Sequence, residues 1–466
     1  SGAVTGSLTG QTQPLLASLP ASVQLALTRL ELQKVLPEGL AVENLKLSAD
    51  GSLEQGFTWQ LDSALQAQQE AFTLTARGQA DTLSVQAEQL LLAATSGPGY
   101  MELQAKASWA DDLRANATVG IEQFPWQHFA GLDEAPVSVD SARLQFDYAN
   151  EHYQGKVQAS MQGPAGPFSV DSQLQGDSNQ VQVQPLQIIA GSGQVQGGAQ
   201  VSWDKAVSWA STLDIKDLNP AYWVADWPGT LDGHVRSSGE LAEQLKLTAE
   251  LQLNGQLRKQ KLASSVRVNA QGEHWRLPEL DIRLGDNRIH GQVQLDERLA
   301  GEWSLALPRL DQLQPGAAGR LQGRIKLSGT LEQPDADIQL NGSRIAFEGQ
   351  RIRDLKLTGY LRQGNSGSLD LSARGLASAD EQLGQLQLKA GGDLGQHQLT
   401  LELKGPLANA DLQLSGSLQP DQLHWQGQLQ QLQVALENQQ WALEQPLAID
   451  YLHEKYARLA AHCLRS

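Results

Sequence analysis

The chain of 466 residues has one cysteine, Cys463, so no disulfide can form within it. A single thiol gives no information on the redox compartment. The chain also lacks an apolar run of about 18 residues, the length that a membrane-spanning helix needs. Its first residues, Ser1-Gly2-Ala3, lack the charged and then apolar layout of a signal peptide, and we expect the sequence to be a fragment of a longer protein.

Aromatic residues are scarce, at 5%, and 35 Lys and Arg stand against 52 Asp and Glu, for a formal net charge of −17. This balance disfavours nucleic acid as a partner, because binding to nucleic acid needs clustered basic residues. It also disfavours tight binding to anionic membrane surfaces.

Motifs for catalysis are missing as well. The nine histidines are scattered, without HExxH or His-x-His spacing, and no P-loop or complete GxGxxG occurs. Residues 191–193 and 364–367 have turn composition, and neither completes GxSxG. His453, His462 and Cys463 are favoured as surface residues over metal ligands. We therefore predict no enzyme, no catalytic residue, no metal and no cofactor.

What the chain contains is leucine alternating with glutamine and other polar residues. Within residues 316–342, the apolar positions of 321–327 and 336–340 recur at every second residue, which places them on one face of successive strands. Residues 332–335 predict a turn, and Asn341-Gly342 is a strong hairpin signal.

A pair of apolar residues spaced by three recurs along the chain. The pairs are Leu27/Leu30, Ile121/Phe124, Ile215/Leu218, Leu307/Leu310 and, after a longer gap, Leu429/Leu432. Such a period, about 93 residues, indicates an array of like units. We predict one continuous body over residues 1–466, with units at 27–120, 121–214, 215–306, 307–428 and a partial unit at 429–466.

Short segments interrupt the alternation. Residues 124–136, 217–228 and 308–315 follow three of the apolar pairs and are predicted to form short helical inserts. Residues 64–71 have helical propensity, but their flanks favour a strand and turn. Residues 452–466 are compatible with a short helix or with a strand.

The predicted fold class is all-β, an elongated sheet of repeating meander units with about 35–40 strands. No segment supplies helices to cover the apolar face, so the sheet is expected to fold over on itself. The interior is then either a closed thin core or an open hydrophobic groove. The tryptophans at strand starts are expected to act as packing plugs; they are Trp59, Trp109, Trp209, Trp303 and Trp425.

The residues predicted to line the groove are the apolar members of the most regular strands. They are Leu247, Leu251, Leu253, Leu321, Ile325, Leu327, Ile338, Leu340, Leu386, Leu388, Leu399, Leu401, Leu403, Leu412 and Leu414.

Residues 319–342 (GRLQGRIKLSGTLEQPDADIQLNG), residues 208–241 (SWASTLDIKDLNPAYWVADWPGTLDGHVRSSGEL) and the Gln/Leu-alternating tail resemble the TamB family of AsmA-like proteins. The resemblance implies a β-taco with an apolar interior that spans the periplasm of a Gram-negative bacterium. It also implies an inner-membrane anchor N-terminal to this chain, and a C-terminal domain, absent here, that docks the outer-membrane barrel partner TamA.

The leading functional hypothesis is a conduit that carries phospholipid acyl chains between the two membranes, which the resemblance favours and which would support outer-membrane biogenesis. The alternative is a scaffold of the translocation and assembly module, whose sheet edges pair with strands of barrels or autotransporters during insertion or secretion. A hydrolase on a β-helix is disfavoured, because no acid, base or nucleophile constellation is present.

Overall fold

The computed structural model describes residues 4–12, 20–30, 40–68, 70–132, 134–379, 381–436 and 439–465. These residues are almost entirely antiparallel β-structure, so the predicted all-β fold class is confirmed. The chain divides into two compact units, Ser1–Ala242 and Glu243–Ser466, called unit 1 and unit 2 below.

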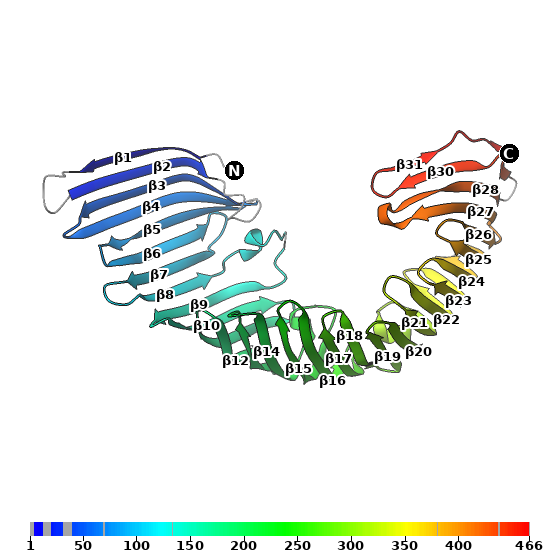
Figure 1. Cartoon of the computed structure of the whole chain (residues 1–466), viewed down its shortest axis with the longest axis horizontal. Coiled ribbons are helices and arrows are strands. Elements are labelled where there is room, and N and C mark those ends of the chain that lie inside the picture. Colours follow the sequence, from blue (N-terminus) through cyan, green and yellow to red (C-terminus); the bar gives the residue numbers. More distant parts are fainter. Residues whose placement is uncertain are drawn as a thin grey trace. The chain divides into compact units, whose positions relative to one another are not determined.

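In unit 1 each strand pairs antiparallel with the next, and Figure 1 shows them side by side in chain order. The strands are β1 (Val4–Thr12), β2 (Pro20–Leu30), β3 (Leu40–Ser52), β4 (Gly56–Ala67), β5 (Glu70–Ala80), β6 (Ser84–Ala94), β7 (Tyr100–Ser108), β8 (Arg114–Glu122), β9 (Ser138–Ala149), β10 (His152–Gly163), β11 (Gly166–Asp177), β12 (Gln180–Ala190), β13 (Gly193–Ser202), β14 (Val207–Leu218) and β15 (Gly229–Leu241). Two 3₁₀ segments interrupt them, η1 (Trp126–Phe129) and η2 (Pro220–Tyr222).

Unit 2 continues the same pattern up to β28, which pairs with both β29 and β30. The strands are β16 (Leu245–Leu257), β17 (Gln260–Gln271), β18 (His274–Leu284), β19 (Asn287–Leu295), β20 (Leu299–Leu307), β21 (Ala318–Gly329), β22 (Pro334–Phe347), β23 (Gln350–Arg362), β24 (Ser366–Ser378), β25 (Glu381–Asp393), β26 (His397–Lys404), β27 (Ala408–Gln419), β28 (His424–Leu436), β29 (Gln439–Leu443), β30 (Leu447–Leu452), β31 (Tyr456–Leu459) and β32 (Leu464–Arg465). The helical segments are α1 (Leu310–Leu313) and η3 (Pro420–Gln422).

The described residues form 32 strands, fewer than the 35–40 expected from the sequence. The difference arises because single strands are long: β22 has 14 residues and runs through a glycine that the sequence analysis took as a boundary. The strand alternative for residues 452–466 is the right one, since β31 and β32 lie there. The strand and turn expected at 64–71 are confirmed by the end of β4 and the start of β5.

The hairpin expected at Asn341-Gly342 is wrong. Both residues lie inside β22, where Asn341 pairs with Gln322 and Gly342 pairs with Leu321 and Leu355. The reversal comes later, at Glu348-Gly349, where both residues have positive φ (48° and 82°), as a type I′ turn requires. Asn-Gly was misread because a glycine inside a strand also permits close backbone approach, and here an added Cβ would lie 2.6 Å from Cδ1 of Ile345.

The turn expected at residues 332–335 lies two residues earlier. The amide of Thr330 donates to the carbonyl oxygen of Gln333 (3.2 Å), and the amide of Gln333 donates to Oγ1 of Thr330 (3.0 Å). Pro334 already belongs to β22, opposite Gly329. The hydroxyl of Thr330 therefore closes this turn.

The three predicted inserts are present as η1, η2 and α1. They replace the hairpin turns that follow β8, β14 and β20, so they recur every six strands. In an antiparallel meander, successive connections alternate between the two sides of the sheet. Each of the three inserts connects an even-numbered strand to the next odd-numbered strand, so each lies on the side where those connections run. We call that side of each unit the insert rim. The exact boundaries of the repeat units stay a prediction.

The chain has a solvent-accessible area of 28610 Å². Even two separate compact domains of half its mass would expose only about 20,000 Å² together. Among the described residues, 18 apolar side chains are buried, and seven of these are alanines. The units therefore bury little apolar surface for their size, and much of the apolar face of the sheet stays accessible.

Candidate functional site

The apolar face of unit 2 is built from rows of side chains that cross the strands. In an antiparallel sheet, directly opposed residues point to the same face. One such row starts at Leu251 and ends at Leu447. Its members are Leu251, Val266, Leu280, Gly291, Trp303, Ile325, Ile338, Gly359, Leu369, Ala390, Leu399, Leu414, Leu429 and Leu447.

A second row runs beside the first, two residues away along each strand except β28, where a bulge makes the spacing three. It continues through the leucines at the centre of the later strands. Its members are Leu253, Ser264, Ile282, Ile289, Leu305, Gly323, Leu340, Leu357, Leu371, Leu388, Leu401, Leu412 and Leu432.

The register brings all fifteen predicted groove residues onto this one face. Each of them is half-buried: none is fully buried and none is fully exposed. A closed core would bury such leucines completely, so this face is covered by neighbouring side chains but not sealed. Their role as a lipid lining stays a prediction.

The opposite face of the same strands is polar. Gln398 pairs with Gly391 and Ser415, and Gln387 pairs with Glu402. Their neighbours include amides and charged groups, so each strand has one apolar and one hydrophilic side. This matches the alternation in the sequence.

Full burial is found where an insert folds over the insert rim. Phe124, which lies before η1, and Phe129, the last residue of η1, pack on Phe72 of β5 with ring centroids 5.6 and 5.1 Å away. Phe72 is 1% exposed, and Ala67 and Leu92 complete the buried cluster. The η1 insert thus closes the sheet over the ends of β4 to β7. Sequence reasoning found the insert but missed the aromatic cluster, because Phe72 lies about 50 residues from its partners.

The second insert is held by Asn219, whose Oδ1 accepts from the amides of Ala221 (3.1 Å) and Gly229 (3.0 Å). Pro220 fixes the first turn of η2. The side chain of Trp223 then packs on buried Phe168 of β11 at 5.4 Å. This insert also covers two preceding hairpins at the insert rim, because the ring of Tyr222 lies against the Gly191 turn.

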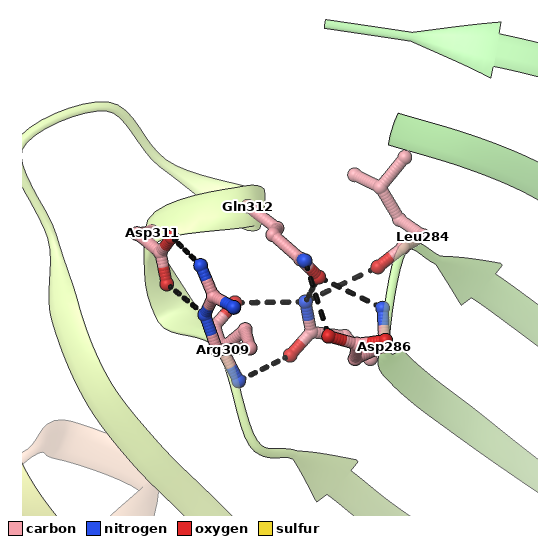
Figure 2. Close-up of polar contacts among 6 residues, drawn as sticks. Leu284, Asp286, Arg309, Asp311 and Gln312 are labelled. Atoms are coloured by element: carbon pink, nitrogen blue, oxygen red, sulfur yellow. Dashed lines mark hydrogen bonds and ion pairs between the residues drawn. The ribbon is translucent and has the colours of Figure 1, made fainter. Parts of the chain in front are cut away.

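The third insert, α1, is held to the hairpin between β18 and β19 by Asn287, which is 2% exposed. Its Nδ2 donates to the carbonyl oxygens of Arg309 (2.8 Å) and Leu284 (3.1 Å) and to Oε1 of Gln312 (3.1 Å). Its Oδ1 accepts from the amide of Arg309 (3.1 Å). Figure 2 shows the surrounding contacts, in which Gln312 also bonds Asp286. Nη1 of Arg258 also donates to the carbonyl oxygen of Leu313 (2.6 Å). Asn287 is thus the buried centre of the contacts that hold this insert.

Beyond α1, the connections on the insert rim are short. The turns after β22 and β26 have no helical segment, and Gly405-Pro406-Leu407 stands where a six-strand spacing would place the next insert. We call strands β21 to β28 the open segment. Within it, the buried apolar residues are Ala373 and Leu429, whereas β16 to β20 contribute Leu257, Leu262, Ala270 and Leu307.

Tryptophans on the apolar face lie over glycines of the neighbouring strand. Trp59 pairs with Gly78 and Trp303 pairs with Gly291, and a Cβ on either glycine would overlap the indole ring. Nε1 of both rings is buried and has no hydrogen-bond partner. These rings fill the space above glycine, which fits their expected packing role. Trp109, in contrast, is 44% exposed and donates to the carbonyl oxygen of Thr82 (3.0 Å).

Charged groups gather on the polar face of β18 and β19. Arg288 donates to both carboxylate oxygens of Asp281 (2.8 and 3.1 Å), and Arg283 donates to the same group. These bonds hold the pKa of Asp281 below its ordinary value. Near the C-terminus, His424 lies 2.6 Å from Asp450 and lowers the pKa of that carboxyl group. Both pairs lie away from the apolar rows and tie adjacent strands together.

Among the residues that the structure describes, no group of three or more His, Cys, Asp or Glu side chains is placed to hold a metal ion. Cys463 is exposed and unpaired. None of the described helices is long and apolar enough to cross a membrane.

The family model described as "TamB, N-terminal domain" matches residues 1–130 and 123–466, which together span the chain. The chain belongs to the TamB family. A curated relative, the translocation and assembly module subunit TamB of Haemophilus influenzae (strain ATCC 51907 / DSM 11121 / KW20 / Rd), is 25% identical over 468 residues. The match covers 96% of this chain and 36% of the relative. No solved structure matches the chain.

Proposed function

We propose that the apolar face of unit 2 carries the acyl chains of phospholipids along its rows of leucines, while the headgroups stay in water. The observation that carries this proposal is that the fifteen aligned residues are half-buried on one face. Covering each 100 Å² of apolar surface with an acyl chain contributes about 2.5 kcal/mol. Most members of the rows are Leu, Ile, Val or Ala, so we expect weak selectivity for the length and unsaturation of the chain.

The cellular setting of the proposal comes from the family. The relative is named as a subunit of the translocation and assembly module. We place the chain in the periplasm as part of a protein anchored in the inner membrane through an N-terminal segment, with the barrel protein TamA as its outer-membrane partner. In that setting the rows would carry phospholipid between the two membranes and support outer-membrane biogenesis.

The test uses a photocrosslinking amino acid at two positions of β26. Leu401 lies in the second row of the apolar face, and Gln398 lies on the polar face of the same strand. After irradiation in cells, lipid adducts are expected at Leu401 and absent at Gln398. Adducts with client proteins in place of lipid at Leu401 would contradict the conduit and would favour the scaffold of a protein-assembly module.

A further inference from the structure

The insert rim of the open segment, where the structure has no insert, carries a group of arginines. Upstream in the described chain, the insert rim is covered three times, by η1, η2 and α1. The group comprises Arg320, Arg344, Arg351, Arg353 and Arg374, called the arginine rim below. All five are exposed. The described acidic residues nearby are Asp354, Glu348 in the turn between β22 and β23, and Glu381 at the start of β25. The rim is therefore basic in a chain whose net charge is −17.

The register places these residues on neighbouring strands. Arg320 pairs with Ser343, which pairs with Asp354, which in turn pairs with Arg374. Arg344 and Arg353 lie opposite one another between the pairs Ser343–Asp354 and Ile345–Ile352. The basic groups thus form a band across four strands, as strands in a sheet are spaced by about 4.8 Å.

The arginine rim is only partly neutralised within the protein. Nε of Arg353 lies 3.0 Å from Oδ2 of Asp354, and Arg351 donates to the carbonyl oxygen of Ala379. Arg320, Arg344 and Arg374 form no ion pair or hydrogen bond with another described side chain. At the covered rim upstream, by contrast, Arg309 is paired with Asp311.

Irregular backbone shapes this rim. Arg344 has a φ of 54°, which is uncommon for a residue with a side chain, and it faces Gly319 with a φ of 103°. On β24, Gly375 has a φ of 63° and lies against Cβ of Arg353. Bulges of this kind bend a strand and re-aim its side chains. Here they occur at the positions that carry the arginines.

The row beside the arginine rim is apolar. Leu355 pairs with Gly342 and Ala373. It is half-buried and continues through Leu386 to Leu403.

Arg353 lies two residues before Leu355 on β23, so these two side chains share the apolar face, and Arg344 lies opposite Arg353. Arg320 and Arg374 align with Asp354 and therefore point to the polar face at the same rim. A molecule whose apolar end lies on Leu355 therefore places an anionic end at Arg344 and Arg353, and Arg320 and Arg374 add positive charge to the rim from the polar face.

We propose that the arginine rim binds the phosphate of a phospholipid headgroup whose acyl chains lie on the adjoining rows, and that it favours lipids with a net negative headgroup. This inference rests on the proposed function and adds the headgroup class to it. Guanidinium groups suit the task, because they bind phosphate oxygens through paired hydrogen bonds. The expected preference for a headgroup with one extra negative charge is about threefold to tenfold.

The experiment incubates the purified chain with vesicles of equal parts phosphatidylethanolamine and phosphatidylglycerol, re-isolates the protein and measures the ratio of the two lipids retained. The wild type is expected to enrich phosphatidylglycerol. The triple variant Arg344→Gln, Arg353→Gln, Arg374→Gln is expected to retain lipid at a ratio close to that of the vesicles. Circular dichroism confirms that the variant is folded.

The control is a second triple variant that also removes three positive charges: Arg267→Gln, Arg276→Gln, Arg283→Gln, on β17 and β18. These arginines are exposed and pair with carboxylates: Arg267 with Glu250 and Glu279 of the adjacent strands, Arg276 with Asp296 after β19, and Arg283 with Asp281 of its own strand. The control is expected to keep the wild-type ratio. Loss of enrichment in the control as well would assign the preference to net charge and overturn the arginine rim.

Failure of this inference differs from failure of the proposed function. If no protein retains lipid, the conduit itself is wrong. If every protein retains lipid at the ratio of the vesicles, only the headgroup preference is wrong. Inorganic phosphate, titrated calorimetrically without vesicles, is expected to give no saturable heat. A saturable heat that the triple substitution removes, beside an unchanged lipid ratio, would assign the rim to a free anion instead.

Discussion

The sheet differs most between the places where an insert covers its rim and the open segment, where none does. Under η1 the rings of Phe72 and Phe124 are buried, and under α1 the amide of Asn287 makes four hydrogen bonds. In the open segment the same kind of strand, with the same alternation, leaves Leu388 and Leu401 half-buried. Alternation alone therefore does not make a closed core here, and the inserts supply the burial.

The largest difference should appear on truncating side chains in the two regions. Phe72→Ala removes a side chain that is 1% exposed from the cluster under η1, and we expect it to lower the local stability by about 3–5 kcal/mol. Leu388→Ala in the open segment should cost about 1 kcal/mol, because the leucine is already half exposed to solvent. Hydrogen exchange read for β5 and for β25 measures both. Equal losses at the two sites would remove the distinction between covered and open regions.

The next effect concerns the anchor of α1. Asn287→Ala leaves the amide of Arg309 and the side chain of Gln312 without their buried partner, which should cost about 2–3 kcal/mol. We expect faster hydrogen exchange in α1 and in the hairpin between β18 and β19, with β24 to β27 unchanged. The matched control is Asn341→Ala at an exposed position of β22, which should change little. An α1 that stays protected after Asn287→Ala would show that the insert is held by other contacts.

A smaller effect is expected at the glycines that lie under tryptophan. Gly291→Ala would place a Cβ against the ring of Trp303, and the forced shift should destabilise β19 and β20 by about 1–3 kcal/mol. Gly391→Ala serves as the control, because its nearest atom is a backbone oxygen 3.7 Å away. Thermal unfolding followed by tryptophan fluorescence reports both variants. A stable Gly291→Ala protein would show that the indole is free to move away.

The smallest effect is a dependence on pH. Arg288 and Arg283 lower the pKa of Asp281 in the folded state, so the carboxylate adds stability above its unfolded pKa of about 3.9. This contribution is lost as the pH falls below about 4 and through the lower folded pKa. Because the pair is partly exposed, we expect less than about 1 kcal/mol. Denaturant titrations at several pH values measure it, and Asp281→Asn should flatten the acid limb by that amount.

The sequence predicted the strands and the three inserts, since both depend on local signals. Alternation fixed the faces of β21 to β28, and Pro220 and the break in alternation marked η2. The wrong hairpin at Asn341-Gly342 has a local cause too: Asn-Gly permits the positive φ of a turn, but neither residue adopts it here, and the missing side chain of Gly342 makes room for Ile345 instead.

The parts that sequence reasoning missed depend on contacts across many residues. Asn287 meets Arg309 and Gln312 over 22 and 25 positions, and Trp303 meets Gly291 only through the register of β19 and β20. The arginine rim becomes visible only when four strands are aligned. A signal was present in the excess of arginine around residues 320–374, but its meaning depends on which rim an insert leaves uncovered.

A lipid conduit requires that the leucine rows are open to ligand rather than packed dry, and Leu401→Arg tests this most directly. In an open face the guanidinium reaches water, so the fold should survive with a loss below about 1 kcal/mol, while acyl chains can no longer pass the charge. Native mass spectrometry should then detect less co-purified phospholipid than in the wild type, and Gln398→Asp on the polar face should change neither the stability nor the lipid. A buried unpaired charge costs several kcal/mol. A Leu401→Arg protein that is destabilised by that amount and unfolds would contradict the open face and, with it, the conduit.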